Sequence, residues 1–145
     1  MKKVISQKNK ERFGKRPWVQ IVNSLSGFKS CNLIGTCNES KETNLAIVSS
    51  VIHLGSDPAL MGFVLRPHSS ESPRHTLLNI NQTKHYTINH VTKSFYKKAH
   101  QTSARYPMEE SEFSKCELEE EWHDDFISPF VKESPIQIGL ELVEG

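Results

Sequence analysis

The stretch from residue 32 to residue 66 constrains the fold most, because β-forming runs alternate there with short polar loops. Residues 32–37 and 44–48 are rich in branched side chains and flank a polar loop. The polar pair Ser49-Ser50 and then an almost wholly apolar run at 59–65 follow. Short runs of this kind, separated by turn-forming residues, are typical of strands. We therefore expect a mainly β fold, with residues 59–65 forming a strand that is buried on both faces.

The beginning of the chain suggests an arm followed by a first strand. Residues 1–16 are basic, polar and aperiodic, so we expect a flexible basic arm there and a single domain over residues 17–145. Residues 18–23 are rich in β-formers and precede the turn signal Ser26-Gly27. We expect them to form a strand in an antiparallel meander with the strands at 32–37 and 44–48.

A helix with a polar, partly cationic beginning should follow the apolar run. Ser72-Pro73 is a favourable start, because serine can cap free N–H groups and proline at the first helical position has no N–H to leave unpaired. Arg74-His75-Thr76 would then lie in the first turn, where the N–H groups and the helix dipole favour an anion. The inward face of this helix would consist of Leu77, Leu78 and Ile80.

Periodicity predicts the remaining elements. Residues 85–91 and 135–145 alternate with a period of two, which indicates strands. Between them we expect a short helix at 92–100 and a helical piece at 111–116 within a long loop. The inward residues of the helix at 92–100 would be Phe95, Tyr96 and Ala99.

The order of these elements, with the runs 32–66, 72–76 and 86–90, resembles the flavin reductase-like family. That family consists of FMN-binding split barrels and includes flavoredoxin-type proteins and the reductase partners of two-component monooxygenases. The resemblance covers roughly residues 17–145. It implies a mainly β split barrel with short helices that works as a homodimer. Family members continue for several more strands, so the resemblance also implies that the domain at 17–145 is truncated at its C-terminus.

The resemblance also implies where a flavin would bind. An FMN site must neutralise one phosphate, bond the edge of the ring and leave one ring face open. We expect Arg66 and the helix beginning near Ser72 to hold the phosphate, and the backbone of residues 49–51 to meet the ring. The predicted cofactor-binding residues are Asn44, Ala46, Ser49, Ser50, Val51, Arg66, His75 and Thr76, with His100 as a candidate neighbour of the flavin or nicotinamide.

The activity implied by the resemblance is an NAD(P)H-dependent flavin or ferric reductase, in which hydride passes from nicotinamide to FMN. NAD(P)H would bind transiently, because the sequence contains no GxGxxG fingerprint. A flavin carries the redox chemistry itself, so no catalytic acid or base is required. Two alternatives stay open: a flavoredoxin-like electron carrier that works with a redox partner protein, and a non-catalytic flavin-binding paralogue.

Composition excludes several other classes of function. A formal net charge of +1 gives no whole-chain case for nucleic-acid or membrane binding. No apolar run approaches the roughly 18 residues of a membrane span, and no secretory signal is present, so we expect a cytoplasmic protein. Three cysteines without CxxC spacing fit a reducing compartment, and seven histidines without HxxxH or HExxH spacing predict no metal site.

Charge is nevertheless uneven along the chain. Residues 2–16 hold seven Lys or Arg against one Glu, and residues 109–125 hold nine acids against one Lys. Such runs are most often solvated ends and loops, and the alternative is a dedicated partner surface.

Overall fold

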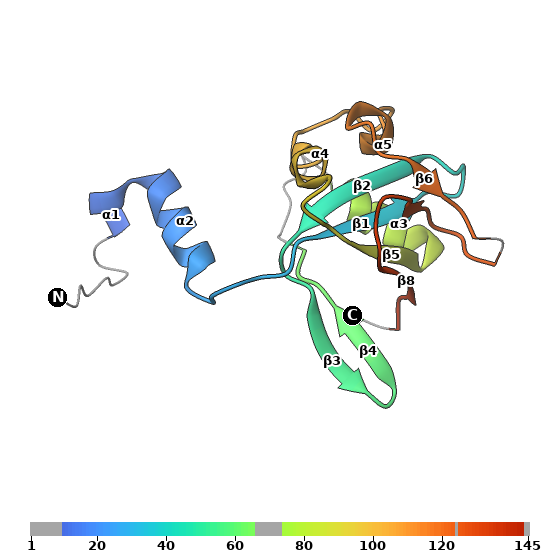
Figure 1. Cartoon of the computed structure of the whole chain (residues 1–145), viewed down its shortest axis with the longest axis horizontal. Helices are drawn as coiled ribbons and strands as arrows, with labels where there is room; N and C mark the ends of the chain where they lie inside the picture. The colour runs from blue at the N-terminus through green and yellow to red at the C-terminus, as the bar shows by residue number, and fades with distance from the viewer. Residues whose placement is uncertain (1–9, 66–73, 124, 144–145) are drawn as a thin grey trace.

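A four-stranded antiparallel sheet forms the centre of the fold (Figure 1). The computed structural model describes residues 10–65, 74–123 and 125–143. Within them the strand order is β2-β1-β5-β8, and every pairing is antiparallel. These strands are β1 (Asn32–Cys37), β2 (Thr43–Val48), β5 (His85–His90) and β8 (Gln137–Glu141). The structure thus confirms four of the predicted strands, including the hairpin of β1 and β2.

A separate hairpin, β3 (Ile52–Ser56) with β4 (Ala59–Gly62), protrudes from one end of the sheet (Figure 1). The prediction of a strand at 59–65 buried on both faces was wrong. β4 ends at Gly62, and its residues are exposed or half-buried. Among the described strands β4 pairs only with β3, and β3 is a strand that the sequence analysis did not predict. A two-stranded hairpin leaves both of its faces open.

The predicted first strand at residues 18–23 is also wrong, because this segment is helical. α1 (Lys10–Phe13) and α2 (Lys15–Ser24) stand apart from the sheet (Figure 1). The apolar residues of the segment recur at helical spacing, namely Trp18, Ile21, Val22 and Leu25. Pro17 lies in the first turn of α2, where proline costs no helical hydrogen bond. The strand prediction rested on the number of branched and aromatic residues and did not take their helical spacing into account.

Three further helices cover the sheet: α3 (His75–Thr83), α4 (Tyr96–Gln101) and α5 (Glu112–Lys115). The short strands β6 (Glu120–Glu121) and β7 (Phe130–Val131) form another pair. The expected inward positions of Leu78 and Tyr96 were wrong, since both side chains are exposed. α3 instead buries Thr76, Asn79 and Ile80, and in the α4 region Phe95 and Ala99 are inside, four residues apart. Ser72 and Pro73 lie outside the described residues.

Two apolar cores lie on the two faces of the sheet, because successive residues of a strand point in opposite directions. Leu33 of β1 belongs to one core, and its neighbour Ile34 belongs to the other. The first core packs α4 and α5 against the sheet through Phe95, Ala99 and Phe113, and the second packs α3 through Ile80. Each fully buried Leu, Ile or Phe contributes about 1.5–3 kcal/mol of burial free energy.

None of the described helices is long and apolar enough to cross a lipid bilayer.

Candidate functional site

A pocket of about 450 Å³ is lined by β2, the beginning of α3 and the connection between α4 and α5. β2 contributes Asn44, Ala46 and Ile47, so the sheet provides one wall. The α3 region contributes Arg74, His75 and Thr76. The rest of the lining comes from residues 102–108 and from Glu112.

The lining of this pocket includes cationic groups. Arg74 precedes α3 in an extended conformation, its own side chain makes no capping hydrogen bond, and the first turn contains no acid. The first N–H groups of a helix and the positive end of its dipole are groups that an anionic ligand can bind. The side chains of Arg74 and Arg105 line the same pocket and add two positive charges. This arrangement suits a phosphate or another anion.

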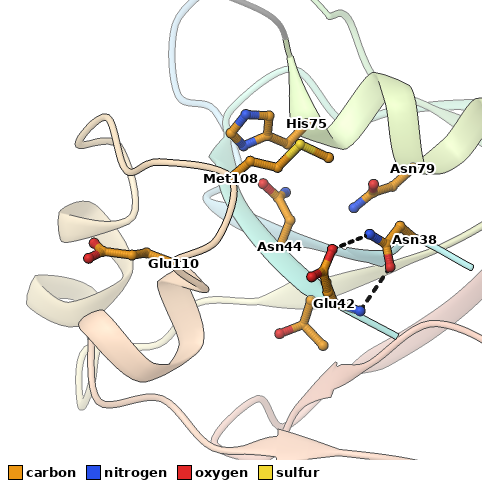
Figure 2. A pocket seen from close by; sticks show the side chains of 8 residues that line it. Asn38, Glu42, Asn44, His75, Asn79, Met108 and Glu110 are labelled. Atoms are coloured by element: carbon orange, nitrogen blue, oxygen red, sulfur yellow. Dashed lines mark hydrogen bonds between the residues drawn. The ribbon is translucent and has the colours of Figure 1, made fainter. Parts of the chain in front are cut away.

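A small recess adjoins the pocket and shares Asn44, His75 and Met108 with it (Figure 2). Its volume of about 10 Å³ corresponds to roughly one water molecule. In Figure 2 Glu42 and Asn38 bond each other at one side of the recess, with 2.6 Å between Asn38 Nδ2 and Glu42 Oε2.

Buried polar side chains join β1, β2 and α3 beneath the pocket. Asn44 Nδ2 donates to Thr76 Oγ1 at 3.0 Å, and Asn79 Nδ2 donates to Thr36 Oγ1 at 3.2 Å. Every buried side-chain nitrogen and oxygen in the described part of the chain has a hydrogen-bond partner. α3 therefore buries Thr76 and Asn79 without an unpaired polar group, and their bonds hold α3 against β2 and β1 respectively.

Glu112 places a carboxylate at the floor of the pocket. The residue is only 8% exposed, and its Oε2 accepts the backbone N–H of Leu45 at 2.9 Å. Burial raises the pKa of the Glu112 carboxyl, while the N–H bond from Leu45, its own backbone N–H and the charge of His75 act in the opposite direction. A carboxyl with a raised pKa is a group that can hold a proton close to a ligand.

Four of the residues predicted from the sequence line this pocket together: Asn44, Ala46, His75 and Thr76. Arg66 lies outside the described residues. Residues 49–51 are not among the lining residues. Ser49 is exposed, the Ser50 hydroxyl bonds both the N–H and the C=O of Val64 at 3.1 Å, and Val51 packs against the second core. His100 is exposed on α4 and is not among the lining residues.

The sequence analysis missed several residues of the pocket. Arg74 was placed with His75 and Thr76 at the helix start that resembles a flavin-binding segment, but it was left out of the predicted cofactor-binding residues although its charge was a signal. Glu112 lay within an acidic run that was read as solvated. Arg105, Tyr106 and Met108 come from an aperiodic loop whose path no pattern predicts. The described residues contain no cluster of three or more His, Cys, Asp or Glu that could hold a metal ion.

Comparisons with known proteins agree with this fold. A putative flavin reductase with a split barrel domain from Shewanella frigidimarina shares 52% sequence identity, with a TM-score of 0.91 over 99% of this chain and 70% of that chain. Flavoredoxin of Desulfovibrio vulgaris is 20% identical, with a TM-score of 0.73 over 83% of this chain and 63% of that one. An FMN-binding domain of a flavin reductase-like enzyme from Shewanella baltica is 15% identical, with a TM-score of 0.64 over 80% of this chain and 59% of that one.

A search of curated proteins found no match. The family model described as flavin reductase like domain matches residues 25–144, which is most of the chain. Together with the sheet, the short helices and the split-barrel architecture of the solved relatives, this match assigns the fold. The chain belongs to the flavin reductase-like domain family.

Proposed function

We propose that this protein binds FMN in the 450 Å³ pocket and uses it as an NAD(P)H-dependent flavin or ferric reductase. The observation that carries the proposal is the set of cationic groups in the pocket lining. The N-terminal residues of α3, Arg74 and Arg105 all contribute to the lining of one cavity, and β2 forms one of its walls.

The pocket fits FMN in size and in chemistry. Its volume lies in the usual range of about 300–1,000 Å³ for small-molecule sites. The α3 N-terminus with Arg74 and Arg105 would hold one phosphate, and the described lining offers no second cradle, which favours FMN over FAD. Ala46 and Ile47, neighbours on the edge strand β2, add apolar groups to the lining.

The remaining lining residues orient the ligand. When bound, FMN supplies the capacity to accept hydride, so the protein needs only to bind, to orient and to exclude water. Asn44 is held by its bond to Thr76 and presents a fixed polar side chain to the cavity. Tyr106 and Met108, from the connection between α4 and α5, complete the lining. Arg66 stays a predicted contact from the family resemblance.

NAD(P)H would act as a transient co-substrate that binds over the flavin, since the sequence lacks a dinucleotide fingerprint. The electrons would pass to free flavin, ferric iron or a partner protein. We propose a cytoplasmic location because all three cysteines, Cys31, Cys37 and Cys116, are free thiols.

We further propose that the protein forms a homodimer. Large apolar side chains are exposed along the β3–β4 hairpin and after it, including Ile52, Leu54 and Val64. Contiguous exposed apolar surface of this kind usually marks an interface.

The experiment combines cofactor identification with turnover. The purified protein should release FMN on heating, as identified by mass spectrometry, and should oxidise NADH or NADPH when free FMN is added. Recovery of stoichiometric FAD, or no affinity for flavin, would overturn the assignment. A flavin-loaded protein that turns over only with a redox partner protein would instead identify an electron carrier.

A further inference from the structure

Glu112 is the only acidic residue among the described residues that line the 450 Å³ pocket. The same lining contains Arg74, Arg105 and His75, so a single carboxyl lies among basic groups. A carboxylate in a pocket for an anion weakens binding, because like charges repel each other. The presence of this acid therefore calls for a reason beyond ligand affinity.

The hydrogen bond that Glu112 makes does not supply that reason. Its Oε2 accepts the backbone N–H of Leu45 at 2.9 Å, and this bond ties α5 to the edge strand β2. The bond needs an acceptor oxygen, which the amide of a glutamine offers equally well. What glutamate adds at this position is the ability to gain and lose a proton.

The surroundings of Glu112 act on its proton affinity in opposite directions. Burial raises the pKa of the carboxyl, whereas the bond from Leu45, its own backbone N–H and the charge of His75 lower it. β2 contributes no titratable side chain. The titratable and charged groups that share the pocket with Glu112 or act on it electrostatically are Arg74 and His75 at the start of α3, Arg105 and Tyr106 before α5, and Cys116 at the end of α5. Because these influences oppose each other, a new charge in the pocket can change the protonation of Glu112.

The proposed function introduces such a charge. Transfer of a hydride to bound FMN adds two electrons and one proton, and therefore one negative charge. A compact cavity of about 450 Å³ is about 10 Å across, so the new charge lies within about that distance of the lining. At an effective dielectric constant of about 20, a charge at about 10 Å raises the pKa of a carboxyl by roughly one unit.

We propose that Glu112 takes up one proton from solvent when FMN in this pocket is reduced, and releases it when the flavin is reoxidised. The inference rests on the proposed FMN site and adds proton exchange to it. The hydride leaves NAD(P)H as NAD(P)⁺ and goes to the flavin, while the solvent proton goes to Glu112 Oε1. Oε2 still accepts the Leu45 N–H, so the bond to β2 is present in both protonation states. The negative charge gained by the flavin is thereby balanced within the pocket.

The first test compares the reduction potential of bound FMN in the wild type and in Glu112→Gln. The full chain is titrated anaerobically with dithionite over a series of pH values, and the flavin absorbance is recorded. At low pH the two potentials should change in parallel, because the carboxyl is then protonated in both flavin states. At higher pH the wild-type potential should fall below that of the variant by about 30 mV in total, which is the two-electron equivalent of a tenfold shift in equilibrium.

Glu109→Gln is the matched control. Glu109 is exposed and lies three residues before Glu112, but it is not among the residues that line the pocket. Its substitution removes the same carboxyl from the surface, so the potentials should follow those of the wild type at every pH.

The second test needs no variant that folds. The reduced-minus-oxidised infrared difference spectrum of the wild type, recorded in the pH range where the potentials diverge, should show a carboxyl C=O band that appears on reduction. This band should be present in Glu109→Gln and absent in Glu112→Gln.

Parallel potentials in the wild type and Glu112→Gln at every pH, or no carboxyl band on reduction, would overturn the inference. A merely structural role of Glu112 gives this result, because losing it lowers stability or affinity without changing the dependence of the potential on pH. A protein that binds FMN but shows parallel potentials contradicts the proton exchange alone. A protein that binds no FMN contradicts the proposed function, and the inference with it.

Discussion

The buried carboxylate of Glu112 accepts a hydrogen bond from the backbone N–H of Leu45, with 2.9 Å between the two heavy atoms. β2 is an edge strand of the sheet, so this N–H points away from β1 and would otherwise lack a ladder partner. Leu45 lies between Asn44 and Ala46, which both line the pocket. The bond therefore fixes the wall of the proposed flavin site from α5.

Glu112→Ala should destabilise the protein by about 1–3 kcal/mol, because it leaves the Leu45 N–H buried without an acceptor. Flavin affinity should fall with it, since the β2 wall loosens. Glu112→Gln retains an acceptor oxygen and should recover most of both losses. Urea unfolding and flavin titration measure the two effects. Equal losses in both variants would show that the charge, rather than the hydrogen bond, is what matters.

The raised pKa of Glu112 makes stability depend on pH in a defined direction. Between the ordinary glutamate pKa of about 4.3 and the raised value, the folded protein holds a proton that the unfolded chain releases. The unfolding free energy of the wild type should therefore fall relative to that of Glu112→Gln as pH rises through this window. Paired unfolding curves across the window provide the measurement. A difference that grows in the opposite direction would contradict the raised pKa.

Arg74→Ala and Arg105→Ala should each weaken FMN binding by about 1–2 kcal/mol. Charge-assisted hydrogen bonds contribute at this scale, reduced here because both side chains are partly solvated. Riboflavin, which has no phosphate, should bind both variants as it binds the wild type. Lys97→Ala is the control for a general loss of positive charge, because Lys97 is exposed on α4 outside the pocket. Equal losses of affinity for FMN and riboflavin would show that these arginines do not bind the phosphate.

Gly35→Ala should destabilise the fold by about 2–3 kcal/mol, in the upper part of the usual range for overpacking. A Cβ at this position would lie 2.3 Å from the carbonyl oxygen of Pro129 and 2.5 Å from Thr87 Oγ1. Both belong to buried segments that cannot move aside cheaply. Gly62→Ala is the control, because its nearest neighbour is the flexible end of Leu54 at 3.2 Å. Thermal unfolding should separate the two variants clearly.

Local pattern was sufficient to predict the strands of the main sheet, and the family resemblance supplied part of the pocket. Residues 32–37, 44–48 and 85–90 alternate or cluster in ways that only a strand in a packed sheet satisfies, and β8 shows the same period. Asn44, Ala46, His75 and Thr76 were named because of the resemblance to the flavin reductase-like family. Their assignment to a flavin stays a prediction until a cofactor is measured.

Tertiary structure decided everything that depends on which surfaces meet. The run at 59–65 looked like a core strand, yet hydrophobicity does not state whether a partner covers it, and β4 pairs only with β3 among the described strands. Residues 18–23 are of types that favour a strand, but they form part of a helix that stands apart from the sheet. Glu112 appeared to be one acid among nine, and only the packing of α5 on β2 buries it against Leu45. Sequence determines the period and polarity of each segment, whereas burial and charge at a site depend on contacts between residues distant in the chain.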